Sequence, residues 1–93
     1  MESKYYVYML LCSDKTFYTG TSNDVKKRVK THNAGKGAKY TKVRRPVKLM
    51  YTEELVDKSA ALKREIAIKK LTRSQKEQLL KSHGINWRDY LIK

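Results

Sequence analysis

The 93-residue chain has a formal net charge of +13, four glycines, one proline and one cysteine, so we expect a single domain, 1–93, around one modest core. The lone Cys12 excludes an intramolecular disulfide and a cysteine-based metal site, which favours a reducing compartment. The sequence contains neither a run of roughly 20 apolar residues nor a secretory signal, so we expect a cytoplasmic protein without a membrane-spanning segment. The large positive charge indicates a polyanionic partner. Nucleic acid is favoured over an acidic membrane surface, because the sequence lacks both an amphipathic anchor and a lipidation motif.

The first predicted element is a β-hairpin. Residues 4–11 and 16–21 are aromatic and β-branched runs, and the polar cluster Ser13-Asp14-Lys15 separates them. This pattern is typical of two antiparallel strands joined by a turn. Lys15 would take the position at which a three-residue turn prefers a left-handed glycine.

The length of the turn decides where two tyrosines lie. A three-residue turn places Tyr8 opposite Gly20, and Tyr8 and Tyr18 then share one face of the sheet as diagonal neighbours roughly 7–8 Å apart. A two-residue turn would put them on opposite faces. Gly20 has no Cβ, which allows a ligand or backbone to approach beside Tyr8.

A helix is predicted to follow over residues 24–32. Ser22-Asn23-Asp24 supplies N-cap side chains and a carboxylate suited to the positive end of a helix, and Gly35 is a stop signal. Arg28 and His32 are four residues apart and therefore lie on one face of this helix. Two tyrosines, an arginine and a histidine are thus predicted to converge.

Residues 33–45 form a glycine- and lysine-rich connection, with a short helical turn predicted near 38–41. Loops of this length are often functional, and cations around an aromatic ring suit contacts with phosphates and bases, although a solvated loop is the alternative. The stretch from Val25 to Thr52 contains no Asp or Glu, whereas a merely solvated surface mixes both signs. The residues expected to contact nucleic acid are Lys26, Lys27, Lys36, Lys39, Tyr40, Lys42, Arg44 and Arg45.

The next predicted elements are a third strand over residues 47–55 and a helix from about 60 to 71, capped by Ser59. On a helical wheel Glu65 lies on a mostly apolar face of this helix, where a carboxylate is costly unless a cation or donor meets it. The wheel alone leaves two roles open for Glu65, an ion pair and a metal ligand.

Residues 73–93 are expected to form a helical extension. Overlapping capping-box patterns at Thr72 and Ser74 predict a helix over about 75–82. Residues 85–92 are predicted to form a final helical turn or two that packs on the body. A second domain is not expected.

Taken in order, these motifs resemble the GIY-YIG nuclease domain. Tyr6-Val7-Tyr8 stands at the first triplet and Tyr18-Thr19-Gly20 at the second, about ten residues later, followed by the helix with its arginine and histidine. Leu62-Lys63-Arg64-Glu65 resembles the helix that carries the family's metal-binding glutamate. The similarity covers residues 4–72 and is close to the small stand-alone bacterial members. It implies an α+β fold with a small, mainly antiparallel three-stranded sheet, in the order strand, strand, helix, strand, helix, helix.

The resemblance also implies a role for each site residue. Tyr8 would activate water, directly or by relay, and Tyr18 would position phosphate or share the base function. Arg28 would neutralise the phosphate, and His32 would assist proton transfer or phosphate binding. Glu65 would hold a single Mg²⁺ or Mn²⁺, because only one carboxylate is well placed. No small-molecule cofactor is expected.

The sequence therefore predicts a metal-dependent DNA endonuclease that selects nucleic-acid structure, since phosphate contacts carry no sequence information. DNA is favoured over RNA, and the oligomeric state stays open. The main alternative is a catalytically weak or inactive nucleic-acid-binding or adaptor domain of the same fold, because Thr21 stands where some relatives have a lysine. A third is a small interaction protein with incidental charge.

Overall fold

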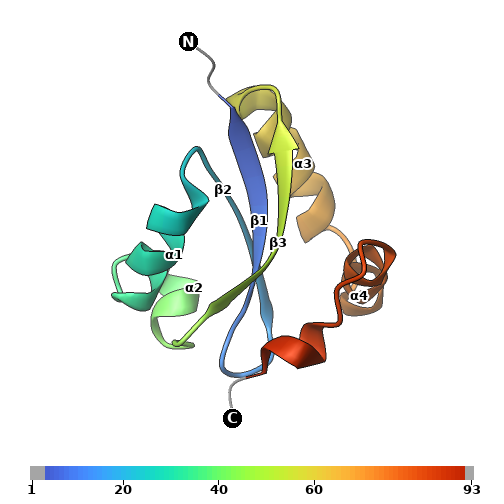
Figure 1. The fold of residues 1–93 in the computed structure, drawn as a ribbon. Coiled ribbons are helices and arrows are strands. Elements are labelled where there is room, and N and C mark those ends of the chain that lie inside the picture. Colours follow the sequence, from blue (N-terminus) through green and yellow to red (C-terminus); the bar gives the residue numbers. More distant parts are fainter. Residues whose placement is uncertain (1–3, 92–93) are drawn as a thin grey trace.

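The computed structural model describes residues 4–91 and confirms the predicted order of elements (Figure 1). The strands are β1 (Tyr5–Leu11), β2 (Phe17–Ser22) and β3 (Lys48–Leu55). The helices are α1 (Val25–Asn33), α2 (Lys39–Lys42), α3 (Lys58–Lys69) and α4 (Arg73–Ser82), and a 3-10 turn, η1 (Trp87–Tyr90), follows them. The strands form one antiparallel sheet in the order β2-β1-β3, so the predicted α+β class is correct. None of the helices described over residues 4–91 is long and apolar enough to cross a membrane.

The hairpin has the register that a three-residue turn requires. Tyr8 pairs with Gly20 and Leu10 pairs with Tyr18 across β1 and β2. The backbone N–H of Cys12 donates to the carbonyl of Thr16 at 2.9 Å, which closes the turn. Lys15 has φ 71°, the left-handed conformation expected at this position.

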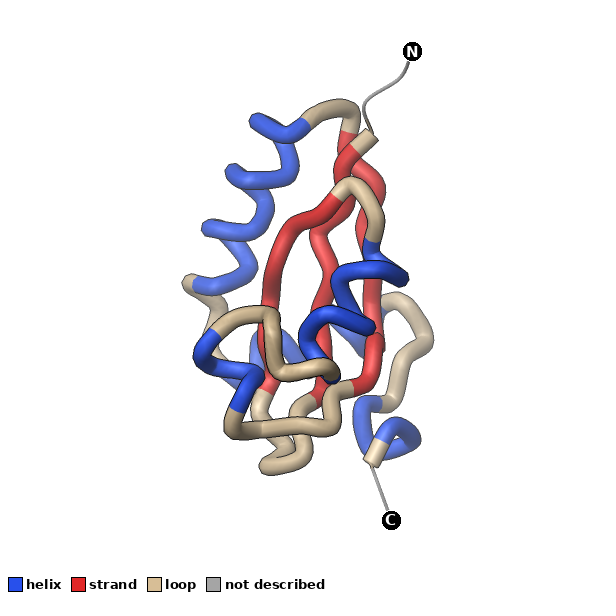
Figure 2. Tube along the Cα trace, turned by 90° about the vertical axis from the view of Figure 1, so that its left-hand side faces the viewer, coloured by secondary structure: helices blue, strands red, loops and turns tan. Residues whose placement is uncertain are grey.

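The central strand β1 is buried on both faces because helices cover both sides of the sheet (Figures 1 and 2). Val7, Met9 and Leu11 point to one face and pack in a cluster that includes residues of α3 and α4. Tyr8 and Leu10 point to the other face, where residues of α1 cover them. The alternation of side chains along β1 therefore separates an apolar core from a face that carries a tyrosine.

The helix caps correct two predicted boundaries. Of the three predicted cap candidates, Asp24 caps α1, its side chain accepting from the N–H of Lys27, so the helix begins at Val25. The cap of α3 is Asp57, not Ser59: the Asp57 carboxylate accepts from the N–H of Ala60, so the helix begins two residues earlier than predicted. The helix α4 also begins two residues earlier than predicted. Of the two overlapping capping-box patterns, the one formed by Thr72 and Gln75 is present.

The C-terminal extension is attached to the hairpin turn through Arg73. Its Nη1 donates to the carbonyl of Lys15 at 2.7 Å, and its guanidinium carbon lies 3.7 Å from the centre of the Phe17 ring and 4.8 Å from that of Trp87. Nε of the same side chain donates to Glu77 at 2.9 Å. The first residue of α4 thus contacts both the turn and the first residue of β2.

Candidate active site

The ring of Tyr8 lies over Gly20 on the face of the sheet that α1 covers. A Cβ built on Gly20 would be 2.6 Å from the Tyr8 hydroxyl oxygen and 3.1 Å from Cε2 of Tyr18. The rings of Tyr8 and Tyr18 share this face, with centroids 6.3 Å apart, as the three-residue turn predicted. The glycine of the second triplet therefore makes room for the hydroxyl end of the tyrosine in the first.

The helix α1 brings His32 against both tyrosines. Nε2 of His32 lies 2.8 Å from the hydroxyl oxygen of Tyr8, and the centroids of the His32 and Tyr18 rings are 5.1 Å apart. Both Tyr8 and His32 are 1% exposed. On its other side, Nδ1 of His32 lies 2.8 Å from Oγ1 of Thr41 on α2. A buried chain of polar groups therefore runs from Tyr8 through His32 to Thr41.

Arg28 and Glu65 both act electrostatically on Tyr8. Burial raises the pKa of Tyr8, and the charges of Tyr18 and Glu65 raise it further, while the Arg28 guanidinium lowers it. Burial lowers the pKa of His32, and the positive charge of Arg28 adds to this shift. Tyr8, Tyr18 and His32 are thus neighbours, and Arg28 and Glu65 act on Tyr8 through their charges.

Glu65 comes to this region from α3, which packs on the opposite face of the sheet. Its side chain is 16% exposed and forms an ion pair with Lys69, with 2.8 Å between Oε2 and Nζ. Within α3 the buried residues are Ala61 and Ile68, while Leu62 and Ile66 are 41% and 54% exposed. Glu65 is therefore at the border between the core and the surface.

The side chains that could bind a metal at this site suit only a divalent ion that the protein coordinates weakly. Over residues 4–91 no three side chains of the His, Cys, Asp and Glu types gather into a metal-binding group. A lone shielded carboxylate such as Glu65 fits Mg²⁺ or Mn²⁺, which keep several water ligands and use substrate oxygens, and does not fit a closed protein cage. The predicted single-ion arrangement is compatible with these residues.

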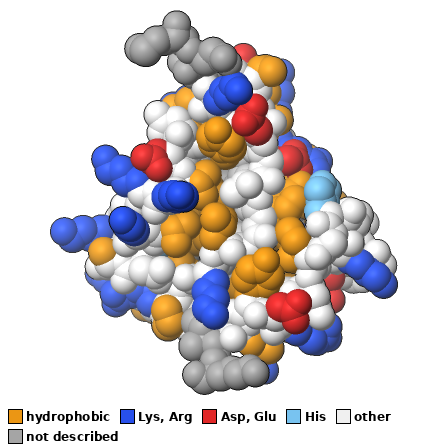
Figure 3. All heavy atoms as spheres, in the orientation of Figure 1, with side chains coloured by type: hydrophobic (Ala, Val, Ile, Leu, Met, Phe, Trp, Pro, Cys, Tyr) orange, Lys and Arg blue, Asp and Glu red, His pale blue; other side chains and the backbone are white. Residues whose placement is uncertain are grey.

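The predicted basic residues are at the surface on and after α1. Figure 3 shows lysine and arginine side chains projecting over the side of the molecule where α1 lies. Five of the lysines predicted to contact nucleic acid are exposed: Lys26, Lys27, Lys36, Lys39 and Lys42. Arg45 is exposed too, but its Nε donates to the carbonyl of Lys42 at 2.8 Å.

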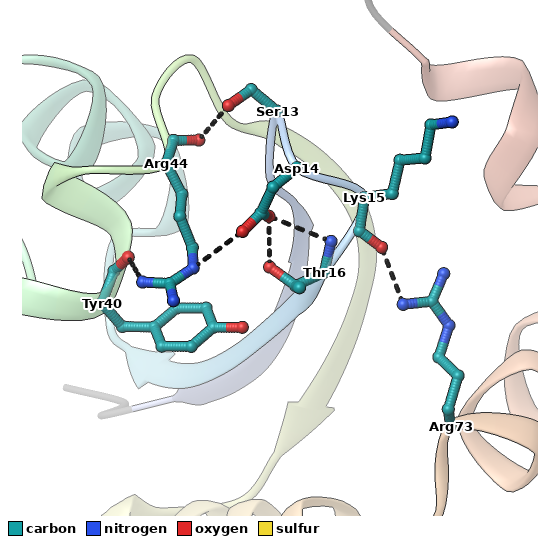
Figure 4. A network of polar contacts seen from close by, with 7 residues as sticks. All are labelled: Ser13, Asp14, Lys15, Thr16, Tyr40, Arg44 and Arg73. Atoms are coloured by element: carbon teal, nitrogen blue, oxygen red, sulfur yellow. Dashed lines mark hydrogen bonds and ion pairs between the residues drawn. The ribbon is translucent and has the colours of Figure 1, made fainter.

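Tyr40 and Arg44 contact other parts of the protein (Figure 4). Arg44 donates from Nε to the carboxylate of Asp14 at 2.9 Å and from Nη1 to the carbonyl of Tyr40 at 2.8 Å. Its guanidinium carbon lies 3.9 Å from the centre of the Tyr40 ring, and that ring stacks on Tyr18 with centroids 6.0 Å apart. These contacts join the hairpin turn, α2 and the tyrosine pair.

Thr41 and Gly37 were not predicted from the sequence. Both lie next to Nδ1 of His32, on the other side of the ring from Tyr8. Thr41 is fully buried, and a Cβ built on Gly37 would be 2.3 Å from Nδ1 of His32. The short helical turn predicted near residues 38–41 is present as α2, but a four-residue helix does not show from sequence which side chain faces inward. The glycines of this connection were the available signal of a close approach.

A second polar cluster lies on the other face of the sheet. Arg64 donates to both carboxylate oxygens of Glu53, at 2.7 and 3.0 Å, and the hydroxyl of Tyr51 donates to Glu53. Burial, followed by the Glu53 hydrogen bond, raises the pKa of Tyr51 to about 12. This bidentate pair fastens α3 to β3.

Comparisons with known proteins identify the family of this chain. The family model described as the GIY-YIG catalytic domain matches residues 4–78. A UPF0213 protein of Lacticaseibacillus paracasei is 54% identical over 84 residues, covering 90% of this chain and 94% of the relative. A UPF0213 protein of Clostridium perfringens is 53% identical over 85 residues, covering 91% of each chain.

Two solution NMR structures have a similar fold. One, of a protein from E. faecalis, matches with a TM-score of 0.61 and 48% identity, covering 90% of this chain and 92% of that chain. The other, of a UPF0213 protein from Bacillus halodurans, matches with a TM-score of 0.56 and 45% identity, covering 84% and 83%. Given the family-model match and these identities, the chain belongs to the GIY-YIG nuclease family and, within it, groups with the UPF0213 proteins.

Proposed function

We propose that this protein is a metal-dependent DNA endonuclease that hydrolyses phosphodiester bonds with Tyr8 as the base. The observation that supports this best is the hydrogen bond of 2.8 Å between the Tyr8 hydroxyl and Nε2 of His32. Arg28 and Glu65 act electrostatically on the same hydroxyl. A base, a proton acceptor, a cation for the phosphate and a metal-binding carboxylate are the groups that phosphodiester hydrolysis needs.

Tyr8 would work as a relay. Burial raises its pKa, so a standing phenolate is disfavoured in the free protein, contrary to what a neighbouring cation alone would produce. His32, whose pKa burial lowers, is neutral near pH 7 and can accept a proton. Tyr8 would therefore pass its own proton to His32 as it takes one from the attacking water.

The charged residues would bind the phosphate. Over residues 4–91 the exposed side chain of Arg28 makes no hydrogen bond or ion pair, so its five donors are available to phosphate oxygens. Glu65 would hold Mg²⁺ or Mn²⁺ after releasing Lys69, and when bound the ion would relieve charge on the phosphoryl oxygen. Tyr18, beside both Tyr8 and His32, would position the phosphate.

The exposed lysines would contact the backbone of DNA on either side of the cleaved bond. Lysine contacts with phosphates are independent of base sequence. With this surface as the main binding area, we expect selection by the shape of the nucleic acid, such as flaps or branches. Arg44 and Arg45, whose guanidinium groups already bond to the protein, would add positive potential and shape the loop.

The decisive experiment compares the wild-type protein with Glu65→Gln on labelled single-stranded, duplex, flapped and branched DNA, with Mg²⁺ or Mn²⁺. We expect the variant to lose cleavage and to keep DNA binding. Glu77→Gln is the matched control, because Glu77 also forms an ion pair with a residue four positions away, Arg73, but on α4. Wild-type protein that binds these DNAs and never cuts them with either metal would favour the adaptor alternative.

A further inference from the structure

We infer that Thr41 is a positioning residue: its hydroxyl oxygen holds His32 in the tautomer with the proton on Nδ1, which leaves Nε2 free to receive the proton of Tyr8. The inference deepens the proposed function and rests on it for its catalytic meaning. The tautomer itself is a property of the folded protein that can be measured without any cleavage.

The directions of three hydrogen bonds carry the inference. Oγ1 of Thr41 lies 3.0 Å from the carbonyl oxygen of Ala38. A carbonyl oxygen has no hydrogen, so the hydroxyl hydrogen of Thr41 must lie between these two oxygens. Oγ1 is then an acceptor toward Nδ1 of His32, 2.8 Å away, and Nδ1 must carry a hydrogen.

The rest of the chain follows from this assignment. A neutral imidazole has one N–H, so Nε2 of His32 is an acceptor. The Tyr8 hydroxyl, 2.8 Å away, then donates to Nε2. Every bond therefore points the same way, from Tyr8 to His32 to Thr41 to the carbonyl of Ala38.

Packing keeps the imidazole in this orientation. Thr41 and His32 are 0% and 1% exposed, so water does not compete for Nδ1. The backbone of Gly37 lies so close that an added Cβ would be 2.3 Å from Nδ1, which leaves little room for the ring to turn. The hydroxyl of Thr41 is itself fixed by the first turn of α2, where Ala38 is the N-cap.

The proton transfer balances with these groups alone. One O–H bond of water breaks and a new O–H bond forms at Tyr8, while the original O–H bond of Tyr8 breaks and an N–H bond forms at Nε2. His32 becomes an imidazolium with hydrogens on both nitrogens. The hydroxide forms a new P–O bond while the P–O bond to the leaving sugar oxygen breaks, and that oxygen takes a proton from solvent water. The Nδ1 hydrogen stays on His32 throughout, hydrogen-bonded to Oγ1 of Thr41, so this threonine needs no rearrangement during the step.

The primary test is the ¹⁵N NMR spectrum of the histidine side chains near neutral pH. We expect Nδ1 of His32 to be protonated and Nε2 to be unprotonated in the wild-type protein. The only other histidine, His83, is exposed at the C-cap of α4, and its Nδ1 lies 3.0 Å from the carbonyl oxygen of Leu79, so it should also carry its hydrogen on Nδ1. A His83→Gln protein removes these signals and assigns the remaining ones to His32. A wild-type His32 with its hydrogen on Nε2 would overturn the inference, even for an active nuclease.

Two variants then separate positioning from packing. Thr41→Val keeps the shape and removes the acceptor, so we expect the His32 tautomer to change and cleavage to fall about 10- to 100-fold. Thr41→Ser keeps the oxygen and should retain the Nδ1–H tautomer and most of the activity. A folded Thr41→Val protein with the wild-type tautomer and wild-type cleavage would contradict the inference. If Thr41→Val does not fold, the spectra of the wild-type and Thr41→Ser proteins decide.

Discussion

The hydroxyl of Tyr8 occupies the space that a side chain at position 20 would fill, because an added Cβ on Gly20 would be 2.6 Å from its oxygen and 2.8 Å from Cζ. Gly20→Ala should therefore destabilise the protein by about 1–3 kcal/mol through overpacking. Without this clash, the same change inside a strand would be stabilising.

Chemical denaturation of Gly20→Ala, Tyr8→Ala and the double variant measures this contact. Removing the Tyr8 ring opens the space, so the alanine at position 20 should cost clearly less in the Tyr8→Ala background. Equal costs in both backgrounds would show that the clash is unimportant.

Loss of the Tyr8 hydroxyl should abolish most of the cleavage. We expect Tyr8→Phe to lower kcat by about 10²- to 10⁴-fold, the usual contribution of a general base, with little change in DNA binding. Tyr51→Phe is the control, since Tyr51 is also buried on the neighbouring strand and its hydroxyl donates to Glu53 on the other face of the sheet. A similar fall in kcat for both variants would argue against a special role for Tyr8.

Cleavage should be lost on the acid side as His32 becomes protonated, because an imidazolium cannot accept the proton of Tyr8. Burial and the charge of Arg28 lower the pKa of His32 below its ordinary value of 6.5. The fall in kcat should thus be centred below pH 6.5, with activity present above it. The other groups that hydrogen-bond to His32 are the hydroxyls of Tyr8, whose pKa burial raises, and of Thr41, and both are uncharged in this range. A fall in kcat centred above pH 6.5 would contradict a buried, neutral His32.

Binding to DNA should depend steeply on salt through the lysines that follow α1. Replacing Lys36, Lys39 and Lys42 by Gln should reduce the slope of log K against log salt concentration by up to about 3, since each phosphate contact on duplex DNA contributes about 0.9. Fluorescence anisotropy at several salt concentrations gives this slope.

A control with the same change in net charge is the triple variant in which Lys63, Lys76 and Lys81, on α3 and α4, become Gln. We expect this control variant to keep most of the wild-type dependence of log K on log salt concentration. If the two triple variants lose the same amount, binding depends on total charge and the region after α1 is not the interface.

The ion pair between Glu65 and Lys69 should compete with divalent ions. Lys69→Gln should tighten Mn²⁺ binding about twofold, because ion pairs four residues apart on a helix contribute only about 0.3–0.5 kcal/mol. Titration of Mn²⁺ followed by electron paramagnetic resonance measures this without DNA. Lys63→Gln, on the same helix, should leave the affinity unchanged, and weaker binding by Lys69→Gln would mean that the lysine supports the ion.

The elements of the fold were predictable because their signals are local. The turn at Ser13 to Lys15 sets the register of the hairpin, which in turn puts Tyr8 and Tyr18 on one face. Helix starts were less predictable when two capping residues were close together, as with Asp57 and Ser59. The residue that lies nearer the preceding strand made the cap.

The site was predictable where family motifs mark it and not elsewhere. The spacing of four between Arg28 and His32 placed both beside the tyrosines. The partner of His32 on its other side is Thr41, nine positions later, and this contact depends on how the connection folds back. The direction of the pKa shift of Tyr8 was also not predictable from the sequence. Burial raises this pKa more than the Arg28 charge lowers it, and burial is a property of the whole fold.

The attachment of Arg73 to the Lys15 carbonyl and the Phe17 ring has a practical consequence for protein engineering. A fragment that ends at residue 72, after the last family motif, would lose these Arg73 contacts. The hairpin turn that sets the alignment of Tyr8 and Tyr18 would then be less well supported. Fusions that borrow this module as a cutting unit should therefore retain α4.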